Sequence, residues 1–350
     1  MNFDLLKRLC EAPGIAGYED AVRAIVVDEM RPLVDDLTVD ALGNVIGTKS
    51  GTGVPRVMLA AHMDEIGFIV KHIDDNGFLR LQAVGGFDPR VLEAQRVLVH
   101  GVDGHVYRGA LQPAAKPIHL LDPSEIKPIK VDDLFVDIGL SGDAVKNIAE
   151  VGTMVTLDRT TEIVGNRVMS KSLDDRVCVY IMIEALRAAQ GTTAEIIAVA
   201  TTQEEVGLRG ARTAAFAVDP DISVALDVTL AADYPGSSPE MAVSRLGSGP
   251  AIKIMDSSHI SNRKLVRHFR DIAAEHDIAY QLEVLPRGGT DAGAMQLTRE
   301  GTPVITLSLP TRYVHSVNEM ADQGDLAACV TLLARFLEAA GSRDYAFDQP

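Results

Sequence analysis

The side chains of this sequence that could do chemistry are two histidines and several carboxylates, each placed beside an apolar segment. In open α/β sheets, ligands bind just beyond the carboxyl ends of the strands. Five segments bring histidine or carboxylate groups to such positions, and we expect them to converge at one edge of one sheet. The groups in these segments are His62, Asp64, Asp174, Asp175, Arg176, Glu204, Glu205, Asp227, Arg312, Tyr313 and His315.

This combination of side chains is typical of a metal site. Imidazole nitrogens and carboxylate oxygens suit zinc, cobalt or manganese, and no thiol lies among them. The set is too large for one tetrahedral catalytic ion and matches two ions that share a bridging carboxylate. Such a pair lowers the pKa of a bound water to roughly 7 and polarises a carbonyl oxygen. The chemistry indicated is hydrolysis of an amide or an ester.

Glu204 and Glu205 are adjacent carboxylates, which more often mark a solvated surface than a site. Here they follow an apolar strand, 196–202, that we expect to be buried on both faces. Two neighbouring charges at such a place are costly unless each has a cation or a proton. One carboxylate acting as a metal ligand and the other as a general base would remove that cost.

Asp64 lies two residues after His62 and could accept the second N–H of a metal-bound imidazole, which fixes the tautomer. An ordinary turn carboxylate is the alternative. His315 taken alone would more often be structural than a ligand. The other histidines fall in a β-rich segment or on polar helix faces, and we interpret them as non-ligands: His72, His100, His105, His119, His259, His268 and His276.

The segment 288–291, Gly-Gly-Thr-Asp, has some features of a phosphate-binding loop. It lacks the full glycine spacing of that motif and a following lysine. We therefore expect a loop near the substrate, with Asp291 as a candidate substrate-binding residue.

The elements that must position these residues alternate between helices and strands. Helical spacing of apolar residues alternates with short apolar runs, which predicts an α/β layered domain with a mostly parallel sheet. The expected helices are 19–31, 174–190, 208–217, 261–276 and 322–340, and the expected strands are 57–61, 196–200, 222–226, 279–285 and 304–307.

Between about 66 and 160 this pattern disappears. Short alternating runs such as 68–70, 97–99 and 154–157 are broken by Gly, Asp-Asn-Gly and Asp-Gly turns. The sequence therefore predicts one α/β domain, interrupted by a small all-β module.

Composition excludes several classes of partner. The net charge of -16 repels nucleic acid and anionic membrane surfaces. No run of about 18 uncharged apolar residues predicts a membrane span, and the N-terminus lacks the pattern of a signal peptide. Cys10, Cys178 and Cys329 are few and unpaired in spacing, so we interpret them as small buried apolar residues. Together these features predict a cytoplasmic protein.

The motifs, taken in order, resemble those of the family-42 metallopeptidases, the tetrahedral and glutamyl aminopeptidases, some of which have been labelled endoglucanases. The resemblance covers nearly the whole chain. The segments that carry it are Ala-His-Met-Asp-Glu-Ile-Gly (61–67), Lys-Ser-Leu-Asp-Asp-Arg (171–176), Thr-Gln-Glu-Glu-Val-Gly (202–207), Asp-Val-Thr (227–229), Gly-Thr-Asp-Ala (289–292) and Arg-Tyr-Val-His-Ser (312–316).

The resemblance implies a phosphorylase/hydrolase-like, three-layer α/β/α catalytic domain (1–66 and 159–350) with an inserted, barrel-like β domain for dimerisation (67–158). It implies two divalent metal ions, zinc or cobalt, and a homo-oligomer built from dimers, such as a tetrahedral dodecamer. One ion would bind His62, Asp174 and Asp227. The other would bind Asp174, Glu205 and His315. Glu204 would be the general base, and Asp64 would orient His62.

Two positions depart from the family pattern. Cys178 stands where a glycine usually follows the Asp-Asp-Arg motif, and Val317 stands where a proline often follows His-Ser. Neither is an expected ligand. We expect the first departure to bear on how the helix packs beneath Asp174.

The function implied is removal of N-terminal residues from short peptides, and other functions remain open at this point. A metal-dependent carboxypeptidase or N-deacylase would need an arginine or lysine for a substrate carboxylate, and Arg176, Arg287 and Arg312 are candidates. A glycosidase would need aromatic platforms, whereas the chain has no Trp and 5% aromatic residues. An inactive assembly protein would lack a ligand, whereas every expected ligand is present.

Overall fold

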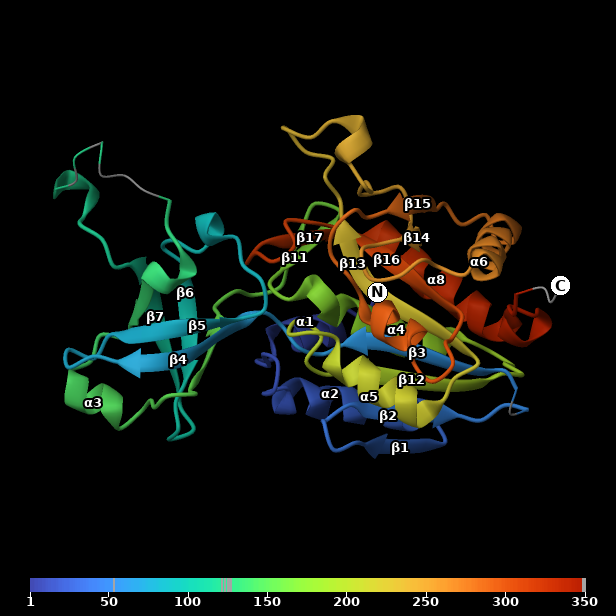
Figure 1. Ribbon diagram of the computed structural model, residues 1–350, viewed down its shortest axis with the longest axis horizontal. Helices are drawn as coiled ribbons and strands as arrows, with labels where there is room; N and C mark the ends of the chain where they lie inside the picture. Colours follow the sequence, from blue (N-terminus) through green and yellow to red (C-terminus); the bar gives the residue numbers. More distant parts are fainter. Residues whose placement is uncertain (53, 121, 123, 125–127, 348–350) are drawn as a thin grey trace.

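The computed structural model describes residues 1–350 except 53, 121, 123, 125–127 and 348–350. It consists of an α/β domain and a smaller β-barrel that extends from one end of it (Figure 1). The barrel strands all lie between residues 67 and 157, so the chain leaves the α/β domain after β3 and returns to it before β10.

An 11-stranded mixed sheet forms the centre of the α/β domain. Its main path runs β1-β2-β12-β3-β13-β16-β17-β11-β10, and β14 and β15 extend from β16 on a branch. The strands are β1 (Asp36–Val39), β2 (Val45–Lys49), β3 (Arg56–His62), β10 (Glu162–Val164), β11 (Arg167–Ser170), β12 (Glu195–Thr201), β13 (Ile222–Leu230), β14 (Ala251–Met255), β15 (Gln281–Val284), β16 (Val304–Arg312) and β17 (Glu319–Asp322).

The parallel pairings lie mainly at the centre of the sheet, between β12, β3, β13 and β16. These strands are apolar along nearly their whole length and are buried on both faces, as parallel strands under two helical layers must be. Toward the edges the pairings are antiparallel, as in the hairpin of β1 and β2. The expected mostly parallel sheet is therefore correct for the centre and not for the edges, where short connections favour antiparallel neighbours.

Helices cover both faces of the sheet and give the three layers α/β/α. Residues of α1, α2, α4, α6 and α8 share one apolar cluster on one face, and α5 and α7 contribute to a second cluster on the other. The helices are α1 (Phe3–Glu11), α2 (Asp20–Met30), α4 (Leu173–Ala188), α5 (Arg209–Val218), α6 (Arg263–Glu275), α7 (Asp291–Gln296) and α8 (Gln323–Ala339). Short 3₁₀ turns are η1 (Arg31–Leu33), η2 (Pro89–Val91), η3 (Ile118–Leu120), η5 (Val131–Asp133), η6 (Pro239–Met241) and η7 (Ala340–Ser342).

The inserted barrel closes in the order β4-β5-β8-β7-β6-β9 and has a core of its own, with residues such as Phe68, Val97, Leu111 and Val136 buried inside it. Closure removes the exposed strand edges that an open sheet of this size would present. The elements are β4 (Gly67–Ile73), β5 (Leu79–Val84), β6 (Arg96–His100), β7 (Val106–Pro113), β8 (Leu134–Asp137), β9 (Met154–Leu157) and the short helix α3 (Gly142–Lys146).

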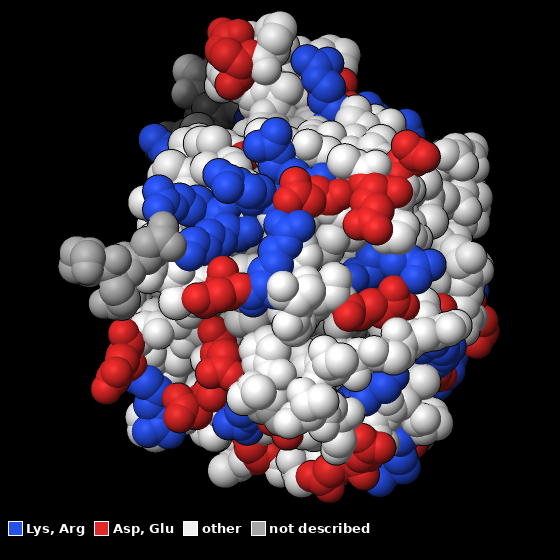
Figure 2. All heavy atoms as spheres, turned by 90° about the vertical axis from the view of Figure 1, so that its right-hand side faces the viewer, with Lys and Arg blue, Asp and Glu red and all other residues white. Residues whose placement is uncertain are grey.

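The structure confirms the predicted fold class, with a three-layer domain and an all-β insert. The three cysteines are free and buried, as expected. Within the described residues, no helix is both long and apolar enough to cross a membrane. Figure 2 shows the face of the α/β domain farthest from the barrel, where basic and acidic side chains lie intermixed.

Candidate active site

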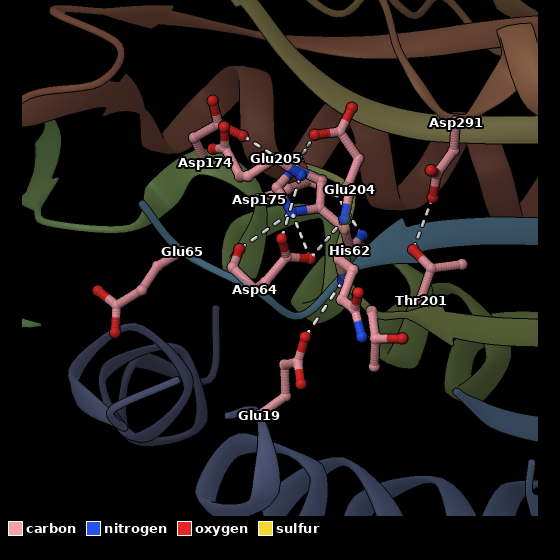
Figure 3. Close-up of polar contacts among 12 residues, drawn as sticks. Glu19, His62, Asp64, Glu65, Asp174, Asp175, Thr201, Glu204, Glu205 and Asp291 are labelled. Carbon is pink, nitrogen blue, oxygen red and sulfur yellow. Dashed lines mark hydrogen bonds and ion pairs between the residues drawn. The ribbon is translucent and has the colours of Figure 1, made fainter. Parts of the chain in front are cut away.

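The candidate residues meet at the carboxyl ends of the central strands. His62 is the last residue of β3, Glu204 and Glu205 follow β12, Asp227 lies in β13, and Asp174 lies in the first turn of α4. His315 comes from the loop between β16 and β17. Figure 3 shows Asp174, Glu204 and Glu205 gathered around His62. The five segments therefore converge at one sheet edge.

Asp174 lies between the two imidazoles. Its Oδ1 is 3.1 Å from His62 Nε2, and its Oδ2 is 3.3 Å from His315 Nε2. Glu205 Oε1 is also 3.3 Å from His315 Nε2. A carboxylate whose two oxygens face two different imidazoles has the arrangement that a bridging ligand needs.

Two sets of three side chains in the described part of the chain could each hold a metal ion. One set is His62, Asp174 and Glu205, and the other is His62, Asp175 and Asp227, with the donor atoms of each set within 4.8 Å of one another. The sequence placed Asp175 at this edge of the sheet but did not assign it as a ligand. Its Oδ2 accepts the backbone N–H of His62 at 3.1 Å, and its Oδ1 is buried without a hydrogen-bond partner.

The electrostatics of this cluster favour bound cations. Burial, reinforced by the charge of Asp174, raises the pKa of Asp227 well above its usual range. Burial likewise raises the pKa of Glu204 well above its usual range, with the charges of Asp227 and Asp291 adding to it and His62 opposing it. Several carboxylates packed together inside a protein need compensating positive charge. The donor set and the unpartnered Asp175 oxygen therefore fit divalent metal ions.

Asp64 holds the two glutamates as well as contacting His62. Its Oδ1 accepts the backbone N–H of Glu204 at 2.9 Å, and its Oδ2 accepts that of Glu205 at 3.1 Å. His62 Nδ1 is 3.0 Å from the backbone oxygen of Asp64 and 3.6 Å from its Oδ1. The closer contact of the imidazole is therefore with the Asp64 backbone, whereas the carboxylate fixes the turn after β12.

Two buried glutamates near the site were not singled out from the sequence. Glu319 Oε1 accepts the backbone N–H of His315 at 2.8 Å, and its Oε2 accepts that of Asp174 at 3.0 Å. Burial and the charge of Asp174 raise the pKa of Glu319 to about 8. Glu319 starts strand β17 and ties together two segments far apart in the sequence, so no local pattern marks it.

Glu65 is the second of these glutamates. It lies 2.6 Å from Lys171 Nζ and accepts the backbone N–H of Gly14 at 3.1 Å, with all three groups buried. It also accepts the hydroxyl of Ser172, which directly precedes α4. Glu65 thereby supports the backbone that leads to Asp174. Its position inside the motif 61–67 was the only signal in the sequence.

Cys178, the first departure from the family pattern, lies one turn along α4 from Asp174. It is buried, and burial, with the charge of Asp175 adding to it, raises the pKa of its thiol well above the usual range. The departure therefore bears on the metal cluster through the charge of Asp175.

A cavity of about 610 Å³ opens above the cluster. Ligand candidates from all five segments line it, and so do Gly288 and Gly289 of the expected substrate loop. Its apolar wall is formed by Leu208, Val228, Leu230, Leu285 and Val314.

The three residues proposed from the sequence for substrate binding lie outside this lining. Asp291 is buried and accepts the hydroxyl of Thr201, the last residue of β12, at 2.6 Å (Figure 3). Arg312 pairs with Asp233 at 2.6 Å. Tyr313 lines a neighbouring cavity.

The arginines weighed for carboxylate binding differ in their positions. Arg176 is fully buried and donates to the backbone oxygens of Leu9, Ala12 and Gly14. Arg312 is held by its ion pair, and only Arg287 of the three lines the cavity.

The chain is similar to known aminopeptidases over nearly its whole length. The family described as M42 glutamyl aminopeptidase matches residues 43–332. Lysyl aminopeptidase of Pyrococcus furiosus is 38% identical over 354 residues, which cover 99% of each chain.

Solved structures agree with this similarity. An aminopeptidase from the archaeon Desulfurococcus kamchatkensis has a TM-score of 0.91 and 40% identity, covering 96% of this chain and 94% of its own. The TET1 peptidase of Pyrococcus horikoshii, described as assembling into a tetrahedron or a large octahedral shell, has a TM-score of 0.86 and 33% identity. That likeness covers 96% of this chain and 98% of the peptidase.

Proposed function

The chain belongs to the M42 glutamyl aminopeptidase family and is an aminopeptidase, and we propose that it hydrolyses the N-terminal bond of short peptides with Glu204 as general base. Family membership implies divalent metal ions. The observation that carries the proposal is the position of Asp174, whose oxygens face His62 and His315 at 3.1 and 3.3 Å.

In this proposal two ions are held by overlapping sets of ligands. His62, Asp174 and Asp227 form one set, and Asp174, Glu205 and His315 form the other. Asp175, which lies with His62 and Asp227, is a further candidate for the first set. When bound, the ions polarise the scissile carbonyl and lower the pKa of the attacking water.

The role of Glu204 is to move one proton. Its Oε2 lies 3.9 Å from His62 Nε2, and the residue lines the cavity where a substrate would lie. The carboxylate accepts a proton from the attacking water and then returns it to the nitrogen of the leaving amine. Asp64 keeps Glu204 in place by accepting its backbone N–H.

The substrate enters with a free amine, which suits the acidic surroundings of the site. We propose that Asp291, Arg312 and Tyr313 contribute to substrate binding from positions outside the metal cluster. Asp291 would do so by holding Thr201, and Arg312 by holding its loop against Asp233. Tyr313 would contact the substrate directly from the neighbouring cavity.

We further propose zinc or cobalt as the bound metal, because imidazole and carboxylate donors without thiolate suit both ions. The barrel, 67–158, would serve as a dimerisation domain between the two parts of the catalytic domain, 1–66 and 159–350. Dimers would assemble further, with a tetrahedral dodecamer as the expected form. The tetrahedral assembly of the TET1 peptidase of Pyrococcus horikoshii supports this. A cytoplasmic location is consistent with the free cysteines.

The alternative functions have less support. A carboxypeptidase or N-deacylase would rely on Arg287, the one arginine of the three candidates that lines the cavity. An endoglucanase would need aromatic residues to stack sugars, and the chain contains no Trp.

The test is hydrolysis of aminoacyl-anilides, each with a free and an N-acetylated amine, by enzyme stripped of metal and then restored with zinc or cobalt. We expect cleavage of the free-amine substrates only, and only after metal is restored. Cleavage of the N-acetylated set, or full activity without metal, would contradict the proposal.

A further inference from the structure

A second cavity of about 540 Å³ adjoins the metal site. We propose that it binds the residues of the substrate that follow the scissile bond, and that it favours apolar or aromatic side chains there. This inference rests on the proposed function, because it extends the same site along the peptide.

The two cavities are neighbours that share part of their walls. Asp88, Val314 and His315 line both of them. His315 is a metal-ligand candidate, so a peptide whose scissile bond lies at the metals can reach the second cavity without leaving the surface. An N-terminal residue has one side chain and fills one cavity, which leaves the other for the chain beyond the bond.

The proposed metal ligands indicate which end of the peptide lies in each cavity. The first cavity contains the ligand candidates Asp174, Glu205 and Asp227 and the proposed base Glu204, so the scissile bond and the N-terminal residue lie there. None of these carboxylates lines the second cavity. Its acidic residues are Glu93 and Asp88, and Asp88 is already paired with Arg90. The uncharged part of a peptide chain therefore fits better in the second cavity.

Exposed apolar side chains gather in the second cavity. Val91, Tyr234 and Tyr313 are 37%, 42% and 44% exposed, and all three line it. The rings of Tyr234 and Tyr313 lie with centroids 5.6 Å apart. Aromatic residues make up only 5% of the chain, so two exposed tyrosines beside a metal site are notable. Such a wall gains free energy by burying an apolar side chain of a ligand.

The cavity is built by both domains. The segment that contains η2, drawn in cyan in Figure 1, leaves the barrel toward β17 and supplies Asp88, Arg90 and Val91. The α/β domain supplies Tyr234 and the loop 313–318. The inserted domain would thus take part in peptide binding, in addition to any role in assembly.

The experiment compares kcat/KM for Leu-Phe-Ala-Ala and Leu-Gly-Gly-Gly, with leucyl-anilide as reference, using the metal-loaded full chain. We expect the phenylalanine peptide to exceed the glycine peptide by about tenfold, which corresponds to about 1.4 kcal/mol. Tyr313→Ala and, on the barrel side, Val91→Ser should each reduce this ratio to about twofold. Tyr313→Phe, which keeps the ring, should retain it.

Tyr18→Ala is the matched control, because Tyr18 is 41% exposed and lines neither cavity. It should leave the ratio of the two peptides unchanged. A parent ratio near one, or a ratio unaltered by both cavity variants, would overturn the inference. The inference would also be overturned if the cavity variants changed the mass of the assembled particle and left the ratio of the two peptides unchanged. The wall of the second cavity would then pack against a second copy of the chain. Failure of the proposed function is distinguishable, because leucyl-anilide and both peptides would then all remain intact.

Discussion

Asp64→Asn tests how the catalytic turn is held. In the parent, each Asp64 oxygen accepts one backbone N–H, from Glu204 at 2.9 Å and from Glu205 at 3.1 Å. An asparagine offers one acceptor oxygen and turns an NH₂ group toward the other N–H. A hydrogen bond to a charged group contributes about 1.5–3 kcal/mol, and the buried N–H would be left unsatisfied. At about 1.4 kcal/mol per factor of ten, we expect kcat to fall about 10- to 100-fold.

The assay is hydrolysis of leucyl-anilide at saturating metal, so that a change in metal affinity does not enter kcat. Asp74→Asn is the matched control. In the turn between β4 and β5, Asp74 Oδ1 accepts the backbone N–H groups of Asn76 and Phe78, both at 2.9 Å, in the barrel. Because one oxygen accepts both N–H groups, an asparagine can keep both hydrogen bonds, and this variant should leave kcat unchanged. If Asp64→Asn kept kcat within about twofold of the parent, the carboxylate would not be holding the catalytic turn.

Three further predictions concern metal affinity and stability. Glu319→Gln should weaken metal binding about 10- to 100-fold, because the amide oxygen can accept only one of the two backbone N–H groups that Glu319 holds. Titration against a competing chelator measures the metal affinity, and an unchanged affinity would contradict the prediction. Glu65→Gln should lower the free energy of unfolding by about 3–5 kcal/mol, because Lys171 would remain buried without its charged partner. Denaturant unfolding of the metal-free chain measures this loss, and a loss well below that range would contradict the prediction. Burial lowers the pKa of His268 from 6.5 to about 4. The contribution of His268 to the free energy of unfolding is therefore complete above pH 6.5 and is lost as the pH falls toward 4. This shift in pKa corresponds to about 3 kcal/mol, so the free energy of unfolding of His268→Gln should fall less between pH 6.5 and pH 4 than that of the parent. Parallel profiles would count against this.

The elements that carry the site could be predicted because their signals are local. The expected helix 261–276 is observed as α6, Arg263–Glu275, where Asn262 caps the first turn. The expected strand 196–200 is observed as β12, since its unbroken apolar run matches a strand buried on both faces. The convergence of the polar groups followed from the rule for sheet edges, which depends on topology and not on side-chain detail.

What the sequence could not predict depends on contacts between distant segments. Spacing pairs Asp64 with His62, whereas the fold brings the backbone of Glu204, 140 residues away, onto its carboxylate. Glu319 carries no signal of its own in the sequence, and only the fold places it beside Asp174, whose backbone N–H it accepts. The order of the barrel strands, with β9 closing between β4 and β6, likewise arises from pairings that no local pattern specifies.

Glu204→Gln is the most direct test of the central claim, which is that this carboxylate moves the proton while its neighbours hold the metal ions. The variant keeps the shape of the side chain and leaves every proposed ligand in place. We expect the metal content to equal that of the parent by elemental analysis, and kcat for leucyl-anilide to fall by about 10²–10⁴. Near-parent kcat with both ions bound would contradict the claim. So would an inactive variant that has lost a metal ion and regains kcat when the metal is restored.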